Sequence, residues 1–137
     1  MSALSTTAGL ALVTLLALTS PSDVRAAADI QTNREGGVTV KATPLSISRQ
    51  AARWDFELEI STHAVPLDQD MVRAAVVIDG AGNTQPPLAW DGDGPGGHHR
   101  KGVLRFLPPE DRPEFVELRI RGIGGVDERV FRWRLNE

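Results

Sequence analysis

Apolar and polar side chains alternate along several short stretches of this chain of 137 residues. The clearest stretch is residues 54–61 (WDFELEIS), where four apolar side chains alternate with three carboxylates and one serine. A period of two residues places each set on its own face of a β-strand, so one face meets a core and the other meets water. The same alternation predicts strands over residues 38–45, 101–106, 115–121 and 128–135.

Four further segments complete the expected set of elements. Residues 72–79 (VRAAVVID) are mostly apolar, which predicts a central strand. Residues 85–90 (QPPLAW) predict a short edge strand, because two prolines cannot donate hydrogen bonds within a sheet. Residues 67–72 predict one helical turn with Asp68 as its cap. Residues 122–126 (GIGGV) predict a tight turn that joins the last two strands as a hairpin.

Seven short strands without a sustained helical period predict an all-β fold. The favoured architecture is an antiparallel sandwich of the immunoglobulin-like or cupredoxin-like type, and a closed β-barrel is the alternative. The Cys–Trp–Cys pattern of true immunoglobulin domains is missing because the chain has no cysteine. The prediction therefore concerns the architecture alone.

Residues 1–28 are predicted to be a signal peptide for export. Residues 8–19 (AGLALVTLLALT) form an uncharged apolar run, and the small residues Ala26 and Ala28 follow it at cleavage-site spacing. Cleavage after Ala28 is favoured, and cleavage after Ala26 is the close alternative. The other alternative, a membrane-spanning helix, needs about 20 apolar residues, and Pro21 ends this run too early.

This division makes residues 29–36 a short polar linker and residues 37–137 the β-sandwich domain. The expected location is the periplasm or the medium outside the cell. Because the chain has no cysteine, disulfides, thiolate metal sites such as blue copper and a lipid-modified cysteine are excluded. The net charge of −3 argues against a general nucleic-acid binder, which is normally basic.

Candidate chemistry gathers in two predicted loops, residues 61–70 (STHAVPLDQD) and 90–100 (WDGDGPGGHHR). All three histidines of the chain lie in them. Imidazole suits copper or zinc, and carboxylates can complete the shell of ligands. If the loops meet at one end of the sandwich, they predict a divalent metal site; the alternative is that the loop histidines are structural. The candidate ligands are His63, His98, His99, Asp68, Asp70, Asp91 and Asp93.

Two other chemistries find weaker matches. Asp91 and Asp93 resemble the start of an EF-hand loop, but its fifth and twelfth positions fall on Pro95 and Gly102, which supply no side-chain oxygen. Looser binding of Ca²⁺ by Asp68 and Asp70, or by Asp91 and Asp93, stays an alternative. Catalysis lacks a nucleophile motif, since G-x-S-x-G is absent. The chain is therefore predicted not to be an enzyme.

Three segments together carry a resemblance to known domains. They are residues 62–70 (THAVPLDQD), 90–106 (WDGDGPGGHHRKGVLRF) and 124–133 (GGVDERVFRW). They are similar to small exported bacterial β-sandwich domains of unknown function. The resemblance covers about residues 37–134 and implies export and a β-sandwich, but no catalytic role for any residue.

These observations predict a small non-enzymatic binding or accessory domain outside the cytoplasm. The most specific hypothesis is that it binds a copper or zinc ion. The alternative is a protein–protein interaction module without metal, in which the His/Gly loop is structural. Such a module would bind through an edge strand or through the arginine-rich face of the last hairpin. The expected partner is another exported protein, with no nucleic acid and no lasting membrane anchor.

Overall fold

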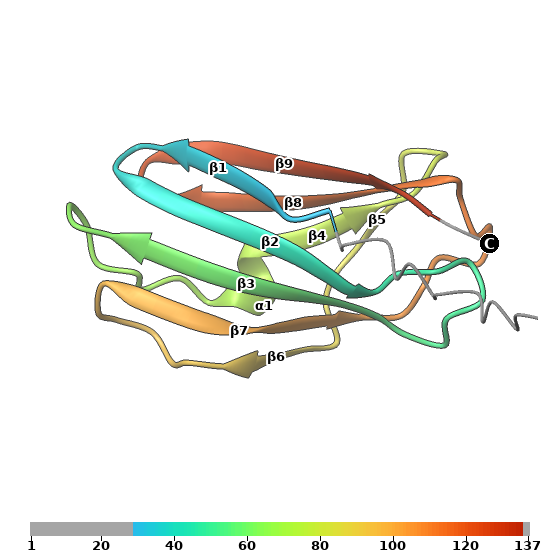
Figure 1. Ribbon diagram of the computed structural model, residues 1–137, viewed down its shortest axis with the longest axis horizontal. Coiled ribbons are helices and arrows are strands. Elements are labelled where there is room, and N and C mark those ends of the chain that lie inside the picture. The colour runs from blue at the N-terminus through green and yellow to red at the C-terminus, as the bar shows by residue number, and fades with distance from the viewer. Residues whose placement is uncertain (1–28, 136–137) are drawn as a thin grey trace, which may run out of the picture.

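The computed structural model describes residues 29–135, which form two antiparallel β-sheets packed face to face (Figure 1). The predicted all-β sandwich is confirmed. The predicted signal peptide lies outside the described residues, as do residues 136 and 137. In the described part of the chain, no helix is long and apolar enough to cross a membrane.

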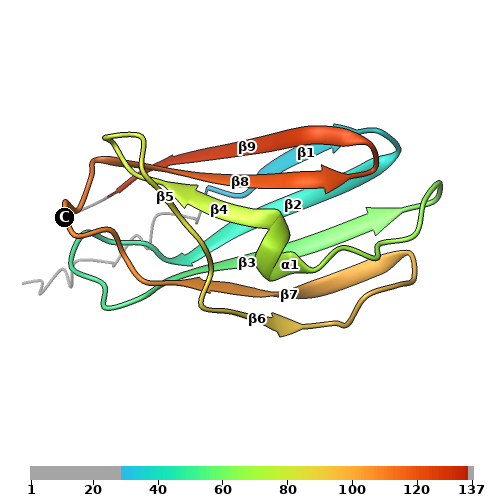
Figure 2. The same ribbon diagram turned by 180° about the vertical axis from the view of Figure 1, so that it is seen from behind.

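Within residues 29–135, the first sheet has the strand order β1-β2-β3-β7-β6 and the second has the order β5-β4-β8-β9. The helix α1 lies where the chain crosses from the first sheet to β4 (Figure 2). The bounds are β1 Gln31–Glu35, β2 Val38–Ser46, β3 Trp54–Thr62, α1 Met71–Ala74, β4 Ala75–Ile78, β5 Thr84–Gln85, β6 Ala89–Gly92, β7 His99–Phe106, β8 Phe115–Ile123 and β9 Val126–Arg134.

The strand order decides between the predicted architectures. The row β2-β3-β7-β6 facing β5-β4-β8-β9 corresponds to the A-B-E-D and C′-C-F-G sheets of an immunoglobulin-like sandwich. β1 is an additional strand outside β2. The sheets remain two open layers rather than one closed barrel, because β6 and β5 end their sheets without pairing to each other.

The prediction of a linker over residues 29–36 is wrong, because β1 lies within it and pairs with β2. β1 also reaches the second sheet. The side-chain amide of Gln31 donates to the main-chain oxygen of Arg132 and accepts from its N–H. The indole N–H of Trp133 donates to the main-chain oxygen of Asp29. The pattern missed this strand because none of its side chains is buried, so it has no apolar alternation.

Two other predicted elements divide differently. The predicted strand over residues 85–90 is two strands, β5 and β6, which belong to different sheets because Pro86 and Pro87 interrupt the pairing. The predicted strand over residues 72–79 begins with α1 and becomes β4 only at Ala75. The helical turn is capped by Asp70 rather than by Asp68, since the Asp70 carboxylate accepts from the N–H groups of Val72 and Arg73.

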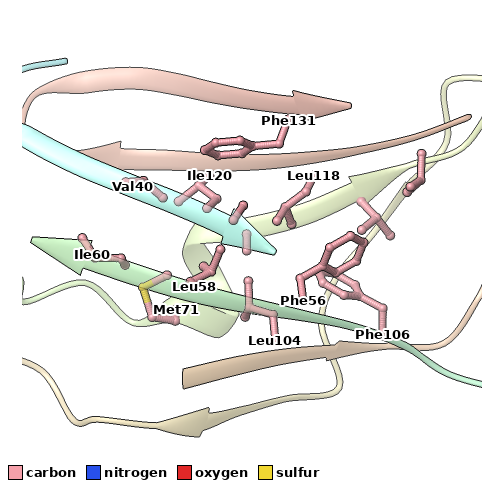
Figure 3. Packing of buried hydrophobic residues seen from close by; sticks show 14 of the residues in the cluster. Val40, Phe56, Leu58, Ile60, Met71, Leu104, Phe106, Leu118, Ile120 and Phe131 are labelled. Atoms are coloured by element: carbon pink, nitrogen blue, oxygen red, sulfur yellow. The ribbon is translucent and has the colours of Figure 1, made fainter. Parts of the chain in front are cut away.

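The core lies between the sheets and is built from the inward faces that the alternation predicted. Figure 3 shows Phe56 and Phe106 of the first sheet beside Leu118 of the second, and Ile120 of the second sheet farther along the core toward Val40. The rings of Phe56 and Trp133 lie 5.3 Å apart between centroids and join the two layers. Burial of each such side chain contributes about 1.5–3 kcal/mol, so these rows supply the main attraction between the sheets.

Four connections meet at one end of the sandwich, on the left of Figure 1. They are the turn at Gly36 and Gly37, residues 63–70 after β3, residues 93–98 before β7, and the turn at Gly124 and Gly125. We call this the loop end. Gly36 and Gly124 both have positive φ angles, 60° and 65°. A side chain at Gly36 would collide with the Gly124 carbonyl, so the two turns can touch only through glycine.

Arg129 lies beneath these two turns, at an inward position of β9, and only 1% of it is exposed. Its guanidinium donates to the main-chain oxygens of Ile123 and Glu35 at 2.9 Å and of Val38 at 3.4 Å. It also donates to the side chain of Asn33. Burial lowers the pKa of the Arg129 guanidinium, and the charge of Glu35 opposes this effect. One side chain therefore joins the first turn to the last hairpin.

Replacement of Arg129 by methionine keeps the length of the side chain and removes its donors. We expect the free energy of unfolding to fall by about 2 kcal/mol or more, because buried carbonyls lose their partner. Urea unfolding would measure this. Arg121→Met on β8 is the matched control, since its pair with Glu128 is exposed. An equal loss for both variants would contradict the bracing role of Arg129.

Candidate functional site

The two loops predicted to carry the chemistry do meet at the loop end. The N–H of Gly96 donates to the oxygen of Leu67 at 2.8 Å, and the N–H of Leu67 donates to the oxygen of Gly97 at 3.3 Å. The N–H of Thr62 donates to the oxygen of His98 at 2.9 Å. Main-chain hydrogen bonds, rather than shared side-chain ligands, therefore hold the two loops together.

Arg100 lies at the centre of this contact and is only 3% exposed. Its Nη1 donates to the main-chain oxygens of Leu67, at 3.2 Å, and Gln69, at 2.7 Å, in the first loop. Its Nη2 and Nε donate to the main-chain oxygen of Asp93 in the second loop, at 3.1 and 3.4 Å. The guanidinium also lies 5.7 Å from the ring centroid of Trp90. It therefore fixes both loops at once.

The charge of Arg100 is set by two opposing influences. Burial lowers the pKa of its guanidinium, while the nearby carboxylates of Asp93, Asp68 and Asp70 raise it. Arginine stays protonated in proteins. The interior of the loop end therefore contains a fixed positive charge.

The three histidines are exposed at separate places on this surface. His63 follows β3. His98 contributes its main-chain oxygen to the loop contact described above. His99 begins β7, pairs with Ser61 and faces outward, since its neighbour Arg100 faces inward.

His99 borders an open groove of about 410 Å³ on the outer face of the first sheet. In that groove Lys41 and Lys101 both donate to Glu59, at 3.2 Å. These hydrogen bonds lower the pKa of the Glu59 carboxyl. The groove is therefore occupied by a surface network of ion pairs between strands.

Three of the four candidate carboxylates already serve the local structure. Asp70 caps α1. Asp91 forms an ion pair with Arg105. Asp93 accepts from the main-chain N–H of Lys101 at 2.9 Å. The fourth, Asp68, is exposed.

Among residues 29–135, no group of three or more histidine, aspartate or glutamate side chains is placed to hold a metal ion. The seven candidate ligands, His63, His98, His99, Asp68, Asp70, Asp91 and Asp93, are therefore not brought together as one shell. Where the loops meet, the structure places the Arg100 cation, which repels a divalent ion.

An open depression of about 360 Å³ lies between the loops. Asp68, Asp70, Trp90, Pro95 and Arg100 are among its lining residues. The side chain of Trp90 lies against Gly102, where an added Cβ would come within 2.6 Å of the ring. Trp90 also donates its indole N–H to the oxygen of Asp93 at 2.9 Å. The depression is thus walled largely by groups that maintain the loops themselves.

Sequence reasoning missed both buried arginines, although the alternation contains their signal. Arg100 has the same parity as Leu104 and Phe106 on β7, and Arg129 has the parity of Phe131 and Trp133 on β9. An arginine at an apolar parity predicts a buried guanidinium that must find acceptors.

A second surface lies on the outer face of the β8–β9 hairpin. Phe115 is 37% exposed, and the guanidinium carbons of Arg132 and Arg134 lie 4.4 and 5.7 Å from its ring centroid. Val130 follows along β9 and is 48% exposed. We call Phe115, Val130, Arg132 and Arg134 the Arg–Phe face.

Comparison of the chain with family models, with curated proteins and with solved structures found no match. The resemblance to small exported bacterial domains therefore stays a prediction. What the chain does must be inferred from the two surfaces that its own side chains form, the loop end and the Arg–Phe face.

Replacement of Arg100 by methionine should release both loops. We expect the free energy of unfolding to fall by about 2 kcal/mol and the amides of Leu67 and Gly96 to exchange at least about tenfold faster with solvent. Hydrogen exchange followed by NMR would measure this. His98→Ala is the control, since that residue acts through its main-chain oxygen. Unchanged exchange in the Arg100 variant would contradict the bracing role.

Because no three of the candidate ligands lie together among residues 29–135, we expect no specific stabilisation by metal. We expect Zn²⁺ or Cu²⁺ to change the melting temperature equally in the native protein and in a His63→Ala, His98→Ala double variant. Thermal unfolding with increasing ion concentration would measure this. A saturable rise that the double variant loses would show that a metal shell forms after all, because a ligand that binds the folded state raises its stability.

Proposed function

We propose that this chain is an exported, non-enzymatic interaction module that binds another exported protein through the Arg–Phe face. Export is supported by the apolar run over residues 8–19 and the small residues after it. The observation that carries the choice of surface is a partly exposed aromatic ring, Phe115, with the guanidinium carbons of two arginines 4.4 and 5.7 Å from its centroid. Aromatic and arginine side chains are the ones that most often dominate the energy of protein interfaces.

The two edges of the second sheet support the choice of its face rather than its edges. The edge of β9 is covered at Arg132, where the Gln31 side chain bonds both main-chain groups. β5 has only two residues, and prolines follow it directly. Short, interrupted or covered edges resist the addition of a further strand. A partner strand would therefore find little main chain to pair with on this side of the sandwich.

The loop end supports the proposal in a different way. Its polar groups are engaged by Arg100 and by main-chain hydrogen bonds between the loops. This agrees with the alternative in which the His/Gly loop is structural. The Arg–Phe face differs, because the apolar surface of Phe115 and Val130 there remains open to solvent.

Site-specific photo-crosslinking would test the proposal. A photoreactive phenylalanine analogue at position 115 should give a discrete adduct with one partner protein in cells that export the chain. The same analogue at Leu88, which is also exposed and apolar but precedes β6, is the matched control. Arg132→Ala with Arg134→Ala should weaken the adduct at position 115. No adduct, or equal adducts at both positions, would contradict the proposal.

A further inference from the structure

The register of the β8–β9 hairpin fixes how the outer face is laid out. Phe115 lies opposite Arg134, Glu117 opposite Arg132, and Arg119 opposite Val130. Along β9 the outward side chains therefore include Val130, Arg132 and Arg134, each two residues from the next. Side chains at this spacing on a strand stand about 7 Å apart. The two arginines therefore extend from neighbouring outward positions of β9, and Val130 occupies the next outward position.

The arginines of this face differ in how far their charge is compensated. Arg119 and Arg121 pair closely with Glu117 and Glu128, at 2.9 to 3.3 Å. The contact of Arg132 with Glu117 is the long one, 3.9 Å between Nε and the carboxylate. Glu117 is also shared with Arg119. The outer face of the β8–β9 hairpin therefore has four arginines, Arg134 included, and two glutamates. These charges sum to a positive value, although the whole chain has a net charge of −3.

Stacking on an aromatic ring determines what these guanidinium groups can still bind. A guanidinium that lies over a ring uses its flat surface, while the N–H groups around its edge remain available. Those edge donors match the two oxygens of a carboxylate, which can accept from them in pairs. Arg132 lies close enough to the ring of Phe115 for this arrangement, at 4.4 Å. The stacking also restricts the motion of the arginine before any partner arrives.

We propose that the Arg–Phe face binds an extended acidic segment of a partner protein, with two carboxylates two residues apart. The inference rests on the proposed function and names the chemistry of its partner. Carboxylates at that spacing in an extended chain repeat at the same distance as Arg132 and Arg134. Val130 and the ring of Phe115 provide apolar contact beside them. A long polyanion such as nucleic acid fits less well, because the rest of the negatively charged surface repels it.

Three synthetic peptides would test the spacing. The first alternates threonine and glutamate, (Thr-Glu)₄. The second has the same composition in the order (Thr-Thr-Glu-Glu)₂, and the third replaces glutamate by glutamine. Binding to the purified protein, followed by NMR titration at low salt, should favour the alternating peptide over its isomer by about fivefold, the range expected for one additional exposed ion pair. The neutral peptide should bind least, and added salt should reduce the preference.

Two variants test whether Arg132 and Arg134 cause the preference for the alternating peptide. Arg132→Gln with Arg134→Gln should remove the preference for the alternating peptide. Arg121→Gln should keep it, although it removes one positive charge from the same face. Equal binding of the two isomers, a preference that survives in the double variant, or tighter binding of a DNA duplex of equal charge would overturn the inference.

The two proposals fail in distinguishable ways. If crosslinking at position 115 gives an adduct but no acidic peptide binds selectively, the face binds a partner of other chemistry and only the acidic segment is wrong. If position 115 gives no adduct in cells while the peptides still bind as expected, the chemistry of the face stands and the proposed function falls.

Discussion

Two buried guanidinium groups are the constraint on which the loop end depends. Arg100 and Arg129 are among the largest buried side chains of the described residues, and both donate mainly to main-chain oxygens. A buried charge costs several kcal/mol unless hydrogen bonds replace its water. The chain meets that requirement by bringing carbonyls from distant segments around each guanidinium. The geometry of four connections is thereby fixed by two side chains, in a protein that has no cysteine with which to join loops covalently.

The buried Arg100 also affects which ligands the loop end can bind. A site for a cation is disfavoured at the loop end, because Arg100 already supplies a positive charge beneath the loops and the carboxylates near it hold N–H groups or arginine. The three histidines are exposed at the surface. Exposed apolar surface with arginine beside it lies instead on the β8–β9 hairpin, where Phe115 is partly exposed and the guanidinium of Arg132 lies over its ring.

The sequence predicted those features that depend on neighbours along the chain. The alternation over residues 54–61 located β3 to within one residue, and the same test located β2, β8 and β9 to within two. It failed at β1, whose role depends on the main chain of β9, some hundred residues away. It also failed for Arg100, since parity shows that a side chain points inward but not which carbonyls surround it. That the two loops meet could be anticipated; that a buried guanidinium lies where they meet could not.

At four positions, 100, 129, 132 and 134, the planar shape of the arginine side chain explains why arginine is used. Thirteen of the 15 basic residues are arginine. At positions 100 and 129 a lysine could not replace it, because one ammonium presents its donors from a single point, whereas a planar guanidinium reaches carbonyls on separate segments at once. At positions 132 and 134 the same planarity allows stacking on Phe115 with the edge donors left free. Burial makes the guanidinium a structural centre in the first pair, and exposure leaves it open to solvent in the second, where we propose that it binds a partner. What distinguishes the two uses is the parity of the residue along its strand.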